Sequence, residues 1–178
     1  STTLATNALV EGQGGRVALI CAGFKDLDLD RQGLREALKG DPVLLAEGGH
    51  SHSGGEAKQL DREAVSAFID SVSQQVTGFA IAGRFATRNP AHELEIAVLV
   101  RDATGLPTTC SHHLSSRLNG PKRAVTAVLN ARLVGMIDAL IGRAEQRLRD
   151  LGIDAPLMVV RGDGALMSTA QARTRPIE

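Results

Sequence analysis

The chain has 178 residues, a formal net charge of zero and 43% hydrophobic residues, which is enough for one domain with its own core. Nucleic-acid and anionic-membrane partners favour a basic excess, and four phenylalanines without Trp or Tyr leave little for base stacking. We therefore expect no nucleic acid and no membrane among its partners. The absence of an 18-residue apolar run and of a leader-like start predicts a cytoplasmic protein.

The first half of the chain alternates helical and β-rich segments. Residues 2–15 look helical up to a glycine cluster, and residues 16–22 form a short β-rich run. Residues 24–40 carry a weak helical pattern, and residues 42–49 read as a strand that enters a polar loop. Asp61 suits the N-cap of a helix whose apolar residues share one face: Val65, Phe68, Ile69 and Val72.

The middle of the chain continues the alternation. Residues 78–85 predict a strand, and Asn89-Pro90 opens a helix that closes near Gly105. Residues 106–115 are expected to be extended. One long helix is expected near residues 121–151, because its apolar residues keep the i, i+3, i+4 spacing.

The last segment predicts a strand over residues 156–162 and a short helix over residues 168–175. Strands that alternate with helices of this length indicate an α/β fold with a mixed or mostly parallel sheet and flanking helices. The strand runs are continuously apolar, which is typical of strands covered on both faces. We expect residues 1–178 to form a single α/β domain.

The turn Arg161-Gly162-Asp163-Gly164 follows a predicted strand and precedes a predicted helix. In open α/β sheets this is where ligands bind, and glycines let backbone N–H groups approach them. Asp163 would repel a phosphate unless a metal or a donor-bearing substrate intervened. Asp-Gly is also common in tight turns, so the alternative is a purely structural bend.

Histidine and cysteine suggest one further site. His50 and His52 are two residues apart, as are Cys110 and His112, and such ligands suit zinc. Neither pair matches a known zinc spacing. We therefore expect that the chain binds no metal, and a zinc site formed by these four residues is the alternative. Cys21 and Cys110 are expected to be reduced, buried thiols. The sequence contains no P-loop, dinucleotide-binding or G-x-S-x-G motif.

Four stretches, in order along essentially the whole chain, resemble the A-type (ATP-dependent) hydantoinases and 5-oxoprolinases. They are STTLATNALVEGQGGRVALI, AGRFATRNPAHELE, LSSRLNGPKRAVTAVLNARL and PLMVVRGDGALMSTAQARTRPIE. The chain departs from that family at residues 162–165, where Ser-Asn-Gly-Gly is frequent, and at residues 119–123, where Glu-Arg-Thr is frequent. The substrate of the named enzymes therefore does not carry over.

The resemblance also implies what surrounds this segment. Family members resemble the actin, sugar-kinase and heat-shock ATPase superfamily, with one glycine-rich phosphate motif before the Thr-Thr segment and another after Arg-Pro-x-Glu. The chain starts after the first and stops before the second, at Glu178. We therefore expect an internal segment of a longer protein that lacks both phosphate-binding motifs.

The resemblance implies a parent enzyme that uses ATP and Mg²⁺ to hydrolyse a small cyclic amide, such as a hydantoin or 5-oxoproline. Its expected partners are the flanking domains, a B-type subunit and the small-molecule substrate. The isolated chain is expected to be inactive and to bind no cofactor. Two alternatives are a non-catalytic module that docks a partner and a small zinc-binding protein. Related members carboxylate ketones, which leaves the reaction open.

Within the resemblance, Asp163 is the predicted catalytic residue. Thr2, Thr3, Asn7, Gly162 and Gly164 are predicted to line the substrate and nucleotide cleft. The alternative for Thr2 and Thr3 is that they only cap the first helix.

Overall fold

The computed structural model describes residues 14–161 and 163–174. The predictions for residues 2–13 and for Gly162 lie outside the described residues. The described elements are β1 (Val17–Ala22), α2 (Asp26–Leu29), α3 (Leu34–Leu38), β2 (Val43–Ala46), α4 (Arg62–Val72), β3 (Gly78–Gly83), α5 (Ala91–Thr104), β4 (Thr108–Cys110), α6 (Ser111–Leu114), α7 (Gly120–Asp150), β5 (Met158–Val160), β6 (Leu166–Ser168) and α8 (Thr169–Thr174).

The main sheet has four parallel strands in the order β2-β1-β3-β4. Strands β1 and β3 lie in the centre and pair over their whole length, from Val17 opposite Gly78 to Ala22 opposite Gly83. All six residues of each central strand are buried, as their continuous apolar runs predicted. The predicted α/β fold with a mostly parallel sheet is confirmed.

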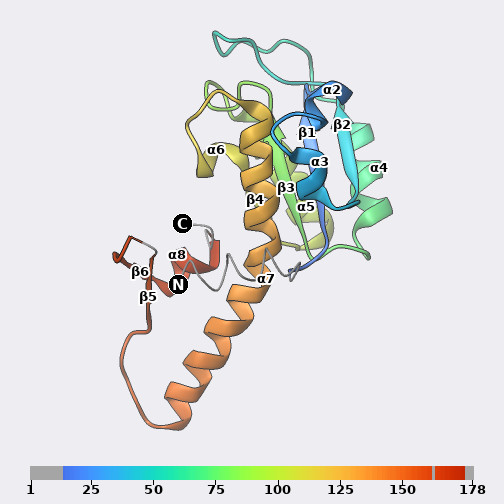
Figure 1. Ribbon diagram of the computed structural model, residues 1–178. Coiled ribbons are helices and arrows are strands. Elements are labelled where there is room, and N and C mark those ends of the chain that lie inside the picture. Colours follow the sequence, from blue (N-terminus) through green and yellow to red (C-terminus); the bar gives the residue numbers. More distant parts are fainter. Residues whose placement is uncertain (1–13, 162, 175–178) are drawn as a thin grey trace.

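Helices cover both faces of this sheet, so the domain has three layers (Figure 1). Alternate residues of β1 point to opposite faces: Ala18 and Ile20 pack with α4 and α5, while Val17 and Leu19 pack with α3 and α7. Asp61 caps α4 as predicted, because its side chain accepts a hydrogen bond from the Ala64 N–H.

The long helix α7 has two different environments. Its first half packs on the sheet, and its second half extends beyond the sheet (Figure 1). There Ile141 forms a second, smaller cluster with Met167 and Ala172 from the C-terminal hairpin and α8. By length and mean hydropathy α7 could cross a membrane, but the core helix of a soluble protein passes the same test.

Three local predictions need correction. The weak helical segment 24–40 is two short helices, separated by a turn in which Gln32 and Gly33 have positive φ. The extended run 106–115 ends at Cys110, and α6 follows. The turn after Arg161 does not lead from the main sheet into a helix; it connects the antiparallel strands β5 and β6.

Candidate functional site

All four strands of the main sheet end on the same side of the molecule, because they run parallel. From β1 the chain passes to β2 on one side, and later to β3 on the other. In open α/β sheets a ligand crevice forms outside the carboxyl ends of two strands whose connections diverge in this way. The segments that follow Ala22, Ala46 and Gly83 therefore bound the candidate site.

Glycines allow these segments to approach one another closely. Gly23 has a φ of +77°, and a β-carbon there would lie 2.5 Å from the carbonyl oxygen of Gly48. A β-carbon on Gly49 would lie 3.1 Å from Cβ of Arg84. Larger residues at these positions would push the segments apart, so their close packing depends on glycine.

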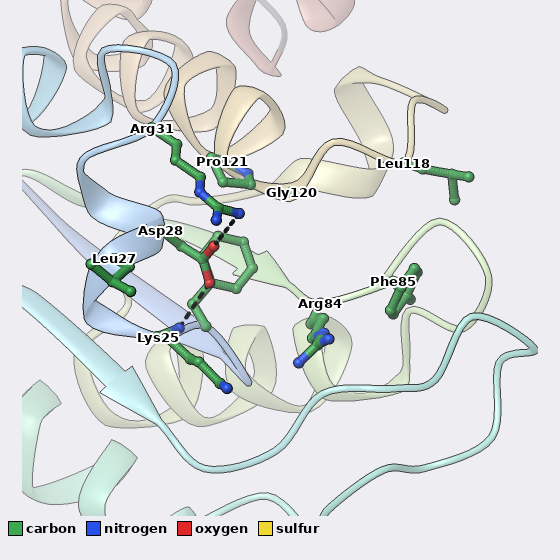
Figure 2. Close-up of a pocket in the computed structure, with 10 residues that line it drawn as sticks. Lys25, Leu27, Asp28, Arg31, Arg84, Phe85, Leu118, Gly120 and Pro121 are labelled. Carbon is green, nitrogen blue, oxygen red and sulfur yellow. Dashed lines mark hydrogen bonds and ion pairs between the residues drawn. The ribbon is translucent and has the colours of Figure 1, made fainter.

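Two cavities of about 420 Å³ each open at this edge, which is the size of small-molecule sites. They share the lining residues Phe24, Lys25 and Arg84, so they adjoin each other, and we refer to the two together as the crevice. Figure 2 shows the first cavity, which lies against the start of α7. Its other lining residues are Leu27, Asp28, Arg31, Phe85, Leu118, Gly120 and Pro121.

The crevice carries a net positive charge. Four cations line it, and two of them are paired: Arg31 lies 3.3 Å from Asp28, and Lys58 lies 2.7 Å from Glu47. No carboxylate of the described residues pairs with the other two, Lys25 and Arg84. These two side chains therefore leave the shared part of the crevice with positive charge that the described residues do not neutralise.

The backbone of Arg84 is held on both sides. Its N–H donates to the carbonyl oxygen of Ala22 at 2.9 Å, and its carbonyl oxygen accepts from the N–H of His50 at 3.1 Å. The next residue, Phe85, has a φ of +54°, which is rare for a bulky residue, and its ring lies 5.7 Å from the Arg84 guanidinium. Such backbone conformations persist where surrounding contacts enforce them, often at ligand sites.

A buried carboxylate, Glu93 on α5, organises the ends of β3 and β4. One of its oxygens accepts from the N–H of Gly83 and the hydroxyl of Ser111, both at 2.6 Å. The other accepts from the backbone N–H of His112 at 3.1 Å and from its Nδ1 at 2.5 Å. These bonds turn the chain back after Cys110, which is why α6 replaces the predicted extended run.

The buried guanidinium of Arg123, on α7, balances this carboxylate through Ser111. Its Nε donates to the Ser111 hydroxyl at 3.2 Å, and its terminal nitrogens donate at 2.7 Å to the carbonyl oxygens of Gly83 and Arg117. Burial lowers the pKa of Arg123, and the charge of Glu93 acts in the opposite direction. The Glu93 network therefore ties α5, α6 and α7 to the end of β3.

The structure brings Cys110 and His112 together, with Glu93 as a third neighbour, and all three ligand atoms lie within 4.8 Å of one another. His50 and His52 do not belong to this group. The Glu93 oxygens already accept four hydrogen bonds, and burial together with Glu93 raises the pKa of the Cys110 thiol to about 12. The arrangement is therefore better suited to a hydrogen-bonded network than to zinc, which binds thiolate.

A pair of buried histidines, His50 and His92, lies beside Gly49. Nδ1 of His92 accepts from the Gly49 N–H at 2.9 Å, so its Nε2 carries the proton and faces Glu56 at the same distance. The ring of His50 lies 4.4 Å from that of His92. Burial lowers the pKa of His50, and His92 lowers it further.

The predicted catalytic residue, Asp163, does not line either cavity. Asp163 is exposed on the β5–β6 hairpin, where it accepts from the Ala165 N–H at 3.0 Å and lies 3.3 Å from Arg161. Gly164 belongs to the same turn, while Thr2, Thr3, Asn7 and Gly162 lie outside the described residues. Sequence reasoning missed Lys25 and Arg84, although both are charged residues just after a continuously apolar strand.

Comparison with known proteins places the chain in a family. Residues 1–104 match the hydantoinase/oxoprolinase N-terminal region. The chain is 30% identical over 193 residues to the caprolactamase subunit alpha of Pseudomonas jessenii, covering 99% of this chain and 28% of that protein. It is 25% identical over 205 residues to the acetophenone carboxylase gamma subunit of Aromatoleum aromaticum, with 98% and 28% coverage.

Two solved structures resemble the fold of this chain. The crystal structure of the ATP-dependent caprolactamase from Pseudomonas jessenii matches with a TM-score of 0.80 and 27% identity, over 93% of this chain and 26% of that chain. Nucleotide-free acetone carboxylase shares the fold, with a TM-score of 0.67 and 14% identity over 96% of this chain and 28% of that chain. The chain thus spans just over a quarter of the length of these relatives. Because the family match covers more than half of its residues, the chain belongs to the hydantoinase/oxoprolinase family.

Proposed function

We propose that this chain is a domain of an ATP-dependent enzyme that hydrolyses a small cyclic amide. The observation that carries the proposal is the match to the ATP-dependent caprolactamase, which has a TM-score of 0.80 and extends over 93% of the chain. The crevice at the ends of β1 and β3 is one part of this domain that faces the ligand.

The chemistry requires an amide oxygen that becomes negatively charged. Activation by ATP would place a phosphoryl group on that oxygen and release ADP. Addition of water to the carbon and cleavage of the C–N bond would then give the amine and an acyl phosphate, which a second water would hydrolyse to the carboxylate and phosphate. Positive side chains close to developing negative charge stabilise the transition state, and Lys25 and Arg84 are placed for that role. The crevice carboxylates Asp28 and Glu47 are paired with cations, so they do not fit a Mg²⁺ site. Any Mg²⁺ would be held elsewhere in the full-length protein.

A second candidate reaction is ATP-dependent carboxylation of a ketone. It is supported by the 25% identity to the acetophenone carboxylase gamma subunit. Both relatives are named as subunits, which supports a partner subunit for this protein as well. The B-type subunit of the family is the partner we propose.

The proposal is tested by measuring ADP release from the full-length protein together with its partner subunit. Caprolactam, hydantoin and 5-oxoproline form one set of substrates, and acetone or acetophenone with bicarbonate forms the other. Lactam-dependent ADP release with ring-opened product supports the hydrolase. Ketone-dependent release alone replaces it by the carboxylase, and release with neither set contradicts both.

Asp163 remains the proposed catalytic residue, as a hydrogen-bond acceptor for a substrate N–H or a holder of metal-bound water. We expect Asp163→Ala to lower turnover by about tenfold or more without unfolding the protein, since lost acid–base or positioning groups have effects of this size or larger. Asp154→Ala, which removes another exposed carboxylate just before the same hairpin, is the matched control. Unchanged turnover in Asp163→Ala would remove Asp163 from the site.

The 178-residue chain by itself is proposed to fold without hydrolysing ATP. Calorimetry that detects micromolar binding of ATP with Mg²⁺ to this chain would contradict that expectation.

A further inference from the structure

We propose that the crevice binds the oxyanion of a small ligand, a carboxylate or a phosphate, between Arg84 and Lys25. The inference depends on the proposed function in one respect only, namely the reaction in which the bound ligand takes part. Its physical basis is the shape, charge and rigidity of the crevice itself.

The charge balance of the crevice selects an anion. Its lining residues carry four cations and two carboxylates, and the two carboxylates are each paired with one cation. Lys25 and Arg84 line both cavities, and no described carboxylate pairs with either of them. Figure 2 shows their side chains in the same part of the cavity, coming from the segments that follow β1 and β3. A planar oxyanion matches the two parallel donors of a guanidinium.

The start of α7 adds to the positive electrostatic potential of the crevice. Gly120 and Pro121 line the first cavity, and they are the first residues of a 31-residue helix. The positive end of a helix dipole favours a negative charge nearby. Asn119 caps the Lys122 N–H, so the cations, rather than this helix end, supply the specific contacts.

The backbone of Arg84 is held in place before any ligand binds. Its N–H donates to Ala22 at the end of β1, and its carbonyl oxygen accepts from His50 in the segment after β2. The left-handed backbone of Phe85 and the close packing of Gly49 against Cβ of Arg84 restrict it further. A cation whose backbone is held in this way loses less conformational freedom when it binds a ligand.

Apolar side chains indicate the rest of the ligand. The first cavity combines its cations with Phe24, Leu27, Phe85 and Leu118. A cavity of about 420 Å³ holds a small molecule that has one anionic group and an apolar body. Hydrolysis of a cyclic amide leaves a carboxylate at one end of an alkyl chain and an ammonium group at the other, so the ring-opened product supplies both the anionic group and the alkyl body.

The test measures binding directly, by calorimetry on the full-length protein in low salt. The probes are inorganic phosphate, 6-aminohexanoate as the carboxylate, and caprolactam as its neutral counterpart. The variants are Arg84→Gln and Lys25→Gln. The matched control is Arg143→Gln, an equal charge change at an exposed site in the extended half of α7. Circular dichroism confirms that each variant is folded.

We expect phosphate or 6-aminohexanoate to bind more tightly than caprolactam, and the preferred anion identifies the source of the oxyanion. Arg84→Gln should weaken its binding by about tenfold or more, as expected for the loss of a charge-assisted hydrogen bond, and Lys25→Gln should weaken it as well. Arg143→Gln should change it by less than about twofold, and added salt should weaken binding to the wild-type protein.

Three results would overturn the inference: no binding of either anion at millimolar concentration, equal binding of caprolactam and the anions, or unchanged binding in both crevice variants. None of these depends on turnover. Anion binding without lactam-dependent ADP release would leave the inference intact and refute the proposed hydrolase. Hydrolase activity together with unaltered anion binding in both crevice variants would refute the inference and leave the proposed hydrolase intact.

Discussion

Replacing Glu93 by glutamine tests whether the buried network holds the site together. The substitution keeps the shape of the side chain but replaces one carboxylate oxygen by an NH₂ group. Each oxygen of Glu93 now faces one backbone N–H, from Gly83 or His112, together with one side-chain donor. The NH₂ group would therefore meet a backbone donor that cannot rotate away.

The expected cost combines two effects. A buried backbone N–H that loses its acceptor costs about 1–3 kcal/mol. The guanidinium of Arg123, only 1% exposed, would also lose the negative charge that reaches it through the Ser111 hydroxyl; the loss of about 3–5 kcal/mol for breaking a direct buried ion pair is an upper bound for this effect. Because the two effects overlap, we expect Glu93→Gln to lower the free energy of unfolding by about 3–5 kcal/mol in total.

Urea denaturation followed by circular dichroism measures this change, and thermal unfolding should show a fall of about 6–20 °C. Glu95→Gln is the matched control on the same helix, because Glu95 pairs with the exposed Arg62 and should contribute less than about 1 kcal/mol. Arg123→Met in the Glu93→Gln background should recover part of the loss. A loss below about 1 kcal/mol in Glu93→Gln would refute the role assigned to the network.

Two further predictions follow from buried titratable groups. Because burial raises the pKa of Cys110 to about 12, its thiol should react with Ellman's reagent at pH 8 far more slowly in the native protein than in urea; equal rates would contradict its burial. The pKa of His50 is lowered by burial and by His92, so the unfolded chain takes up its proton more readily. The free energy of unfolding should therefore fall as the pH drops below 6.5, and His50→Gln should reduce that fall in urea titrations at pH 7.5 and 5.5; an equal fall in both proteins would refute this.

The sequence alone determined the elements whose signals are local. The continuous apolar runs that became β1 and β3 predicted strands buried on both faces, and both lie in the centre of the sheet. The i, i+3, i+4 spacing predicted α7 to within one residue at each end. Asp61 and Gly105 marked helix ends because capping depends on groups within one turn of the chain.

The tertiary structure alone decided the features that depend on distant partners. Residues 111–114 fold as α6 because Glu93, far away in sequence, accepts their hydrogen bonds. The turn at Asp163 lies in a hairpin because β5 pairs with β6 in antiparallel orientation. No local sequence pattern specifies which strand a given strand pairs with. Lys25 and Arg84 belong to one crevice only because parallel pairing places the ends of β1 and β3 side by side. Periodicity and capping act within a few residues, whereas strand pairing and buried hydrogen bonds join segments that only the folded core brings into contact.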